Sequence, residues 1–226
     1  MPKKKILLKL SGEFLCSADS AIDIKRVFAL AREVAVIRCQ YQLGLVIGGG
    51  NIFRGRQMSK QKIVNPAAWH FVGMESTVVN ALALKAAFDQ LKTPAMVISA
   101  FDKHKVNPQK YFSQGVIVIF AAGTGRPFVT TDSGAVERAL EIKADILLKG
   151  TKVDGVYSAD PKKNPRAKKI ARLSAEEYLK IKNASIFDQA AAILAAEKKL
   201  PIYIFKWGKD SLKKAIALKA QGTLIT

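Results

Sequence analysis

The sequence is poor in residues from which many protein sites are built. It has two cysteines, Cys16 and Cys39, without metal or redox spacing, so we expect free thiols in a reducing compartment. Its two histidines, His70 and His104, leave little scope for a zinc site or a histidine-based triad. No apolar run approaches the ~18 residues of a membrane span, and the opening "MPKKK" lacks the apolar region of a signal peptide. These absences predict a soluble, cytoplasmic protein.

Acidic residues are scarce, and this scarcity produces a formal net charge of +19, from 37 Lys and Arg against 18 Asp and Glu. Such a charge can mark a nucleic-acid-binding surface, or a solvated basic surface shared with a site for anionic nucleotides. The basic residues are scattered without interleaved stacking aromatics, at Lys3 to Lys5, Lys60 and Lys62, Lys162 to Lys169, and Lys213 and Lys214. We therefore expect neither a nucleic-acid partner nor a membrane.

What the sequence does contain is an alternation of aliphatic runs with helical patterns. Near-continuous aliphatic runs are typical of strands buried on both faces, which predicts an α/β fold with a layered, mainly parallel sheet. The predicted strands are residues 5–10, 43–50, 95–100, 116–123, 144–150 and 201–205. The predicted helices are residues 22–37, 73–91, one that begins near Thr131–Asp132, one after a Ser174–Glu177 capping box, 187–199 and 210–220. Without a linker or repeat, residues 1–226 form one predicted domain.

A glycine-rich stretch, "LVIGGGNIFRGR" at residues 45–56, follows the second predicted strand. It is neither a Walker A loop nor a GxGxxG fingerprint, so by itself it fits a phosphate cradle and a tight turn equally well. Small residues also end three other predicted strands, at residues 11–12, 123–126 and 150–151. Ligands of such sheets bind at the carboxyl ends of strands. Together, these four strand ends favour a phosphate site.

Five stretches resemble the bacterial UMP kinases of the amino acid kinase family. They are "KLSGE" from Lys9, "VIGGGNIFRG" from Val46, "AAGTGRPFVTTDSGA" from Ala121, "KGTKVDGVYSADP" from Lys149 and the final "GTLIT". They stand in the family's order and span nearly the whole chain. The resemblance implies a three-layer α/β/α sandwich and a homohexamer built from dimers. It also implies transfer of the γ-phosphoryl group of ATP to UMP, with Mg²⁺, for pyrimidine nucleotide synthesis.

Four charged residues are the candidate catalytic groups: Lys9, Asp132, Lys149 and Asp188. Phosphoryl transfer needs charge neutralisation, and a lysine between aliphatic stretches is costly unless it is used, so Lys9 fits a cation that bridges donor and acceptor phosphates. Lys149 ends a buried strand and is a second candidate for charge stabilisation. Asp132 fits either an N-cap or first-turn acid or, by resemblance, a group that organises lysines or magnesium. Asp188 fits either a helix cap or an active-site acid.

The resemblance also assigns the two nucleotide subsites. The positions that match ATP-binding residues are Lys9, Leu10, Ser11, Gly12, Gly50, Arg54, Thr151, Tyr157 and Asp160. The positions that match UMP-binding residues are Gly49, His70, Thr124, Gly125, Arg126, Pro127, Phe128, Val129, Thr130 and Thr131. No protein-held metal site is predicted, so Mg²⁺ is expected only together with ATP.

The chain departs from the family pattern in three places. His70 stands where the family has an Asp that binds the UMP ribose, and a neutral imidazole cannot match a carboxylate that accepts from two hydroxyls. Glu75, two residues past Gly73, is an alternative source of that carboxylate. Arg126 replaces a common Asn and adds a cation beside the acceptor. The stretch between Ala100 and Val116 is shorter than usual.

Two other functions remain open from the sequence. One is a family member that phosphorylates a carboxylate or carbamate acceptor, which would share the ATP half of the site. The other is a catalytically weakened relative that binds nucleotides or nucleic acid, which the positive charge and His70 would suit.

Overall fold

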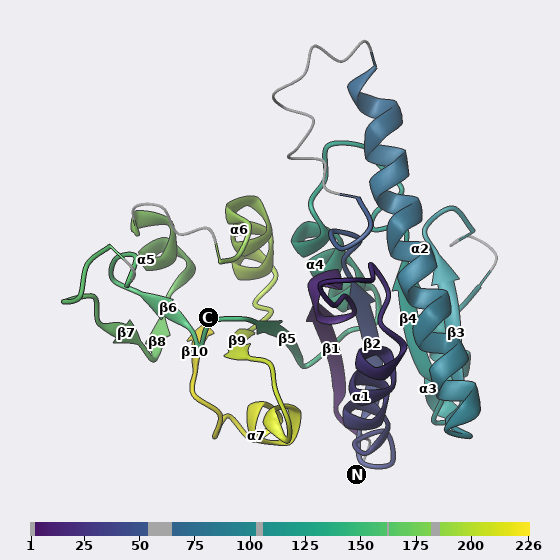
Figure 1. The fold of residues 1–226 in the computed structure, drawn as a ribbon. Coiled ribbons are helices and arrows are strands. Elements are labelled where there is room, and N and C mark those ends of the chain that lie inside the picture. Colours follow the sequence, from purple (N-terminus) through teal and green to yellow (C-terminus); the bar gives the residue numbers. More distant parts are fainter. Residues whose placement is uncertain (1–2, 54–64, 103–105, 162, 182–185) are drawn as a thin grey trace.

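The computed structural model describes residues 3–53, 65–102, 106–161, 163–181 and 186–226 (Figure 1). Its core is an eight-stranded sheet in the order β3-β4-β2-β1-β5-β9-β10-β8, beside a small hairpin of β6 and β7. The strands are β1 Lys5–Leu10, β2 Gln42–Ile47, β3 Ala95–Ser99, β4 Ile117–Ala121, β5 Ile146–Thr151, β6 Val156–Tyr157, β7 Lys169–Ile170, β8 Arg172–Leu173, β9 Ile202–Lys206 and β10 Gly222–Ile225.

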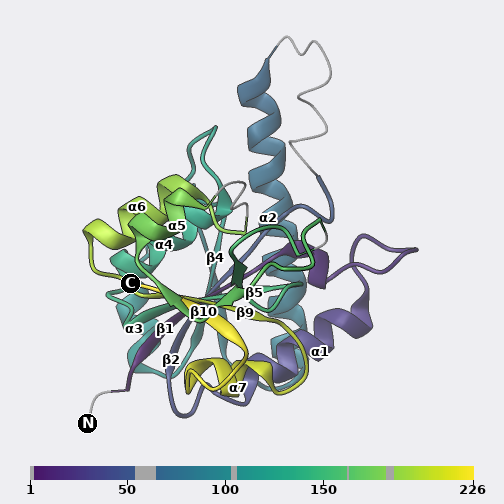
Figure 2. The same ribbon diagram turned by 90° about the vertical axis from the view of Figure 1, so that its left-hand side faces the viewer.

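Helices cover both faces of this sheet, and Figure 2 shows the resulting layers. The helices are α1 Ile24–Ala35, α2 Pro66–Gln90, α3 Pro108–Ser113, α4 Thr131–Glu141, α5 Ala175–Lys180, α6 Gln189–Glu197 and α7 Ser211–Ile216, with a 3-10 turn η1 at Gly12–Phe14. Along β1, Ile6 and Leu8 join the core with α1, α2 and α7, whereas Leu7 joins the core with α3 to α6. This alternation explains why the strand is aliphatic throughout. The predicted three-layer α/β/α sandwich with a mainly parallel sheet is confirmed, and β9 and β10 pair antiparallel within that sheet.

The longest helix, α2, begins at Pro66 and not at the predicted Gly73. The Asn65 side chain accepts a hydrogen bond from the backbone of Ala68, and Pro66 occupies the first turn, where proline is favoured. None of the residues in these additional turns is buried, so no stripe of core positions marks them in the sequence. By length and by a mean hydropathy of 1.2, this helix would suffice to cross a membrane, but 44% of that window is buried inside the protein. It packs against the sheet as a core helix.

The shortest elements differ most from the sequence-based expectation. The helix α3 and the two-residue strands β6, β7 and β8 were not predicted, and α7 ends at Ile216 instead of near Ala220. A strand of two residues has no periodicity of its own, because its pairing partner defines it: β8 exists through its register with β10. The predicted capping box of α5 is confirmed, since Ser174 and Glu177 each accept a hydrogen bond from the other's backbone.

Candidate active site

The four strand ends singled out in the sequence lie side by side. β1 pairs in parallel with β2 and β5, and β2 pairs in parallel with β4. Parallel strands end at the same edge of a sheet, so residues 11–12, 48–50, 122–126 and 150–151 meet at one edge. The topology therefore brings together the stretches from which a phosphate site was predicted.

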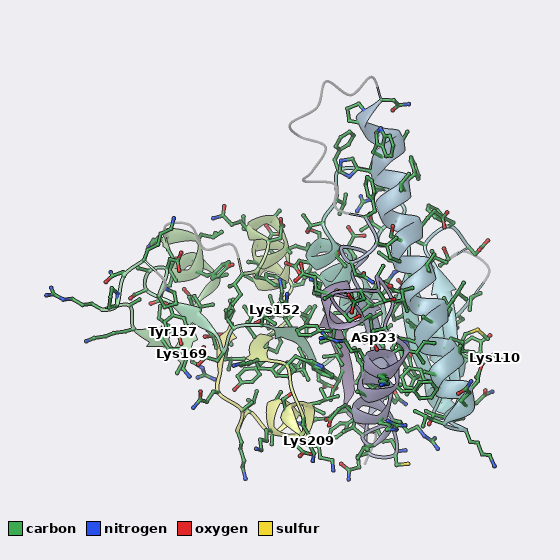
Figure 3. All side chains as sticks on the ribbon, in the orientation of Figure 1. Asp23, Lys110, Lys152, Tyr157, Lys169 and Lys209 are labelled. Carbon is green, nitrogen blue, oxygen red and sulfur yellow. The ribbon has the colours of Figure 1, made fainter. Side chains whose placement is uncertain are left out.

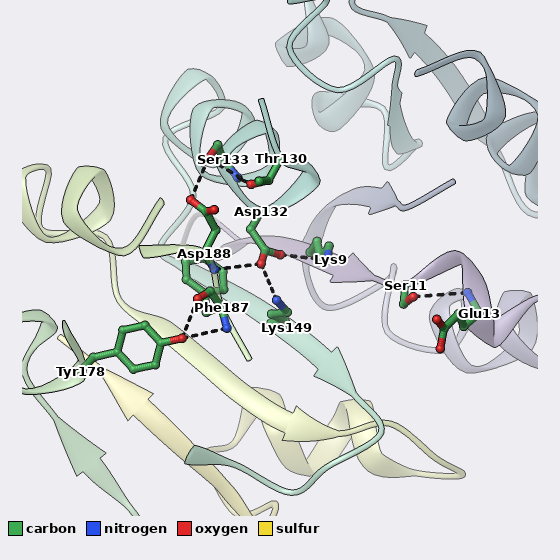
Figure 4. A network of polar contacts seen from close by, with 10 residues as sticks. All are labelled: Lys9, Ser11, Glu13, Thr130, Asp132, Ser133, Lys149, Tyr178, Phe187 and Asp188. Carbon is green, nitrogen blue, oxygen red and sulfur yellow. Dashed lines mark hydrogen bonds and ion pairs between the residues drawn. The ribbon is translucent and has the colours of Figure 1, made fainter. Parts of the chain in front are cut away.

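A lysine–aspartate–lysine cluster lies at this edge (Figure 4). Lys9 and Lys149 are register partners on β1 and β5, so their side chains leave the same face of the sheet. The Asp132 carboxylate, in the first turn of α4, lies between them: Oδ1 is 2.8 Å from Lys9 Nζ, and Oδ2 is 2.5 Å from Lys149 Nζ. All three residues are at most 9% exposed. Two ammonium groups thus share one carboxylate, an arrangement suited to attracting an anion.

The cluster shifts the pKa of two of its members. Burial alone would raise the pKa of Asp132, but Lys9 and Lys149 outweigh it and lower that pKa to about 2. Burial, and then the charge of Lys9, lowers the pKa of Lys149 to about 8, against the opposing effect of Asp132. The carboxylate is therefore ionised at neutral pH, whereas Lys149 loses its proton as the pH rises through about 8.

Asp188 proves to be a helix cap that also contacts the cluster. Its Oδ1 accepts hydrogen bonds from the Ala191 backbone N–H at 2.9 Å and from the Ser133 hydroxyl at 3.3 Å. Its own backbone N–H donates to Asp132 Oδ2 at 3.1 Å. Of the two sequence-based interpretations, the cap is confirmed, and the residue reaches Asp132 through its backbone.

The glycines after β1 and β2 are required by close packing. A Cβ atom on Gly12 would lie 2.1 Å from Asn51 Oδ1 and 2.3 Å from the Gly48 carbonyl oxygen, and one on Gly49 would lie 2.8 Å from the Gly73 carbonyl oxygen. Nothing larger than glycine fits the two positions without movement.

Two asparagines hold the glycine-rich loop, and sequence reasoning missed both. Asn80, fully buried in α2, donates to the Gly48 carbonyl at 2.7 Å and to Asn51 Oδ1 at 2.7 Å. Asn51 donates back to Asn80 at 3.0 Å and to the Ala21 carbonyl at 2.7 Å. The one available signal was a polar residue inside the apolar run "VVNALAL" of a core helix.

The predicted acceptor loop, Thr124 to Thr131, connects β4 to α4. Its backbone turns sharply, with positive φ at Gly125 and Phe128 and at the preceding Ala122. Thr77 of α2 fixes the start of this turn by accepting a hydrogen bond from the Ala122 backbone N–H at 2.7 Å. Thr130 ends the loop by capping α4. The loop therefore leads directly into a helix N-terminus, where anions are favoured.

His70 contacts this loop from α2, and Arg126 lies within the loop. The His70 ring lies 4.4 Å from the Phe128 ring, centroid to centroid, so α2 brings His70 against the predicted acceptor loop. Arg126 forms an ion pair with Glu137 of α4, which compensates the additional charge expected from the sequence. Glu75 lies on α2 with an exposed side chain.

The stretches after β1 and β5 face each other. Lys152 Nζ lies 2.5 Å from Glu13 Oε2, joining the turn after β5 to η1. Thr151 closes its turn by donating to the Val153 carbonyl at 2.5 Å. Ser11 caps η1 by accepting from the Glu13 backbone N–H at 3.3 Å. These contacts order the edge at which Leu10, Ser11 and Gly12 were predicted to hold ATP.

Tyr157 lies on the β6–β7 hairpin, next to Lys169 (Figure 3). Its hydroxyl donates to Asp154 Oδ1 at 2.8 Å, and Lys169 Nζ lies 3.2 Å from Asp154 Oδ2. The buried Thr223 anchors the hairpin to β10, accepting from the Val156 N–H at 2.8 Å and donating to the Ile170 carbonyl at 2.6 Å. The "GTLIT" stretch therefore attaches the β6–β7 hairpin to the sheet.

Two further positions, Asp160 and Arg54, were predicted to bind ATP. Asp160 lies in the turn after β6, where its carbonyl accepts from the backbone of Asn164 at 2.8 Å. Arg54 lies outside the residues that the structure describes. The positive charge is spread over the molecule: Lys110 on α3, Lys152 after β5 and Lys209 before α7 lie in separate parts of Figure 3. This distribution agrees with the solvated basic surface inferred from the sequence.

Comparison with known proteins places this site in a family. The sequence model of the amino acid kinase family matches residues 4–206. The chain is 44% identical to a uridylate kinase of Ectopseudomonas mendocina (strain ymp), covering 98% of this chain and 93% of the relative. It is 41% identical to a uridylate kinase of Legionella pneumophila (strain Lens), with 98% and 93% covered.

Solved structures agree in fold over the whole chain. The UMP kinase of Ureaplasma parvum superposes with a TM-score of 0.92 at 32% identity, covering 100% of both chains. The UMP kinase of Bacillus anthracis superposes with a TM-score of 0.89 at 32% identity, covering 100% of this chain and 97% of the other. The chain therefore belongs to the amino acid kinase family, and to the uridylate kinase group within it.

Proposed function

We propose that the protein transfers the γ-phosphoryl group of ATP directly to the phosphate of UMP, giving UDP and ADP. The observation that carries this proposal is the buried pair of Lys9 and Lys149 around Asp132, at the edge where four parallel strands end. Phosphoryl transfer depends on positioning and on stabilising charge that moves between phosphate oxygens. Two fixed ammonium groups at a strand edge provide that stabilisation.

The cluster divides this work between its members. Lys9 bridges the donor and acceptor phosphates and stabilises the charge as it redistributes in the transition state. Lys149 adds a second positive charge while it remains protonated, below about pH 8. Asp132 holds the two ammonium groups in place, and the Asp188 backbone N–H orients Asp132. The acceptor needs no general base, because a phosphate monoester with a second pKa of about 6 is already largely a dianion at neutral pH.

The nucleotides occupy neighbouring strand ends in this proposal. ATP binds Leu10, Ser11 and Gly12 at the end of β1, Gly50 and Arg54 after β2, and Thr151, Tyr157 and Asp160 from the end of β5 onward. UMP binds Gly49, His70 and the loop Thr124, Gly125, Arg126, Pro127, Phe128, Val129, Thr130 and Thr131. Support comes from the acceptor loop, which leads into the N-terminus of α4.

Mg²⁺ enters this proposal with ATP. Among the residues that the structure describes, no group of three His, Cys, Asp or Glu side chains could hold a metal ion. The Asp132 carboxylate already contacts two ammonium groups and one backbone N–H. Because Asp132 is engaged by these groups, the site fits an ion held by phosphate oxygens and water, the usual mode of Mg²⁺ at nucleotides. When bound, the ion neutralises phosphate charge.

The protein is proposed to act as a homohexamer built from dimers. Large apolar side chains are exposed along α2, where Val79 and Leu82 are 46% and 55% exposed and Trp69 and Phe71 are each 41% exposed. An exposed apolar face of this kind is typical of a subunit interface. Sedimentation analysis tests the assignment, since a monomer at micromolar concentration would refute it.

A cytoplasmic role in pyrimidine nucleotide synthesis completes the proposal. Cys16 and Cys39 are both free thiols, as expected in a reducing compartment. Fractionation of cells that express the tagged protein tests this location.

Coupled measurement of ADP release across UMP, CMP, dUMP and small carboxylic acids tests the reaction. UMP should give the highest kcat/KM, and omitting the acceptor should reduce ADP release to background. Phosphorylation of a small acid without phosphorylation of UMP would replace the proposal by the carboxylate or carbamate alternative. Nucleotide binding without turnover of any acceptor would instead indicate the catalytically weakened relative.

Changing His70 to aspartate should tighten UMP binding. A carboxylate at this position can accept hydrogen bonds from both ribose hydroxyls, and hydrogen bonds to charged groups contribute about 1.5–3 kcal/mol each. We expect His70→Asp to lower the KM for UMP about tenfold and to leave the KM for ATP unchanged.

Two control variants complete this experiment. His70→Ala removes the ring contact with Phe128 without adding an acceptor, so it should not lower the KM for UMP. Glu75→Gln tests the alternative carboxylate. Unchanged UMP kinetics in His70→Asp, together with loss of UMP turnover in Glu75→Gln, would transfer the ribose contact to Glu75.

A further inference from the structure

Tyr178 makes a two-point contact with the backbone of a residue next to the catalytic cluster. Its side chain is fully buried on α5. The hydroxyl donates to the Phe187 carbonyl at 2.6 Å and accepts from the Phe187 backbone N–H at 2.8 Å. Phe187 precedes α6, and the tyrosine hydroxyl satisfies both of its backbone polar groups (Figure 4). The contact fixes the backbone of Phe187 in position and orientation.

The position of Phe187 matters because two groups near Lys149 depend on it. The Phe187 ring lies 4.9 Å from Lys149 Nζ, in a cation–π contact. The next peptide N–H, that of Asp188, donates to the carboxylate oxygen of Asp132 that contacts Lys149. Moving the Phe187 backbone would therefore change both the aromatic face and the carboxylate that stabilise the ammonium group.

The charge of Lys149 is sensitive to such a change. The groups that face it are Lys9 from β1, Asp132 from α4, Asp188 at the start of α6, and the Phe187 ring. Burial and Lys9 lower its pKa to about 8, whereas Asp132 and Asp188 raise it. Because this pKa is near physiological pH, a small loss of stabilisation changes the protonated fraction.

We propose that Tyr178 is a positioning residue for phosphoryl transfer, holding Phe187 and Asp188 so that Lys149 stays protonated and aimed at the phosphates. Tyr178 touches neither substrate nor reacting atoms and acts through the backbone of Phe187. The proposal rests on the proposed function for its effect on turnover, but the effect on Lys149 does not need a substrate.

Tyr178→Phe removes both hydrogen bonds and keeps the aromatic packing. We expect kcat to fall about tenfold, because active-site groups that lose their support lose productive geometry, with the KM for each nucleotide within about twofold of the parent. The basic limb of the kcat/KM profile, at about pH 8 in the parent, should move to lower pH by about 0.5 unit as the ammonium loses stabilisation.

Tyr203→Phe is the matched control. Tyr203 is also buried, and its hydroxyl donates to a backbone carbonyl, that of Ala220, at 2.6 Å. This variant loses a comparable hydrogen bond on the other side of the sheet, so its basic limb should stay at the parental pH. Equal changes in the two variants, or a parental profile in Tyr178→Phe, would overturn the proposal.

A substrate-free measurement separates this proposal from the proposed function. The lysine side-chain carbon-13 signal that disappears in Lys149→Arg reports the Lys149 titration in the unliganded protein. Tyr178→Phe should lower that midpoint even if UMP is not the acceptor, and an unchanged midpoint overturns the proposal. If Tyr178→Phe does not fold, Phe187→Leu removes the ring while keeping the backbone. It should lower the same midpoint, and a parental midpoint in it would overturn the proposal.

Discussion

Asp132→Asn is expected to inactivate the protein and to destabilise it more than any surface substitution. Lys9 and Lys149 would lose the carboxylate that they share, at 2.8 Å and 2.5 Å, and would face each other inside the protein. Removing one partner of a buried ion pair typically lowers the free energy of unfolding by about 3–5 kcal/mol. Lys149 would also lose the charge that most raises its pKa, so that pKa should fall further below the ordinary lysine value. We expect kcat/KM to fall about a thousandfold or more.

The stabilisation that Asp132 contributes to the folded protein should depend on pH. The pKa of Asp132 is lowered from 3.8 to about 2 in the folded protein, so the folded state favours the ionised form. The resulting stabilisation is fully present above about pH 4 and is lost as the pH falls toward 2. We therefore expect the parent and Asp132→Asn to differ in free energy of unfolding, measured with urea, by less at pH 2.5 than at pH 7.

Asp89→Asn provides the surface comparison. Asp89 pairs with Lys85 at 2.6 Å on α2, but the two side chains are 56% and 31% exposed. Exposed pairs of this kind contribute at most about 1 kcal/mol. Equal losses of stability in Asp132→Asn and Asp89→Asn would show that the buried cluster is not an essential ion pair.

Lys9→Ala is expected to lower kcat about a hundredfold or more while changing the affinity for ATP much less. The reason is that a cation between donor and acceptor phosphates gains most of its interaction energy as charge redistributes in the transition state. Steady-state kinetics should therefore assign the loss to kcat. Near-parental turnover would remove Lys9 from the mechanism.

A second measurement on Lys9→Ala checks its position independently. The charge of Lys9 lowers the pKa of Lys149, so its removal should move the basic limb of the pH profile above about 8. Lys85→Ala, which removes a lysine from the exposed face of α2, should leave both kcat and the limb at parental values.

The sequence was sufficient for those parts of the fold and site that depend on local pattern. Continuous aliphatic runs predicted the parallel sheet, and small residues at strand ends predicted the edge where Lys9 and Lys149 meet. The pairing of both lysines with one carboxylate followed only from the register of β1 with β5. Resemblance suggested that Asp132 organises lysines, and the structure shows which oxygen contacts which lysine: Oδ1 contacts Lys9 and Oδ2 contacts Lys149.

The contacts that support the site were not predictable, because each joins residues distant in sequence. Asn80 reaches the Gly48 carbonyl from 32 residues away, and Thr223 reaches Ile170 from 53 residues away. Neither residue type has a motif that reveals its partner. The His70 ring against Phe128 depends on the extra turns of α2, which the sequence pattern did not indicate.

The central position of β1 has a consequence for the newly made chain on the ribosome. β1 is synthesised long before its neighbour β5: Lys5 bonds to Asp145, 140 positions further on. At a translation rate of about 5–20 residues per second, β1 waits roughly 7–30 s for that partner. During this delay its aliphatic edge is available to chaperones, and Lys9 has no companion ammonium. A nascent chain therefore completes its Lys9–Asp132–Lys149 cluster only after β5 has been made.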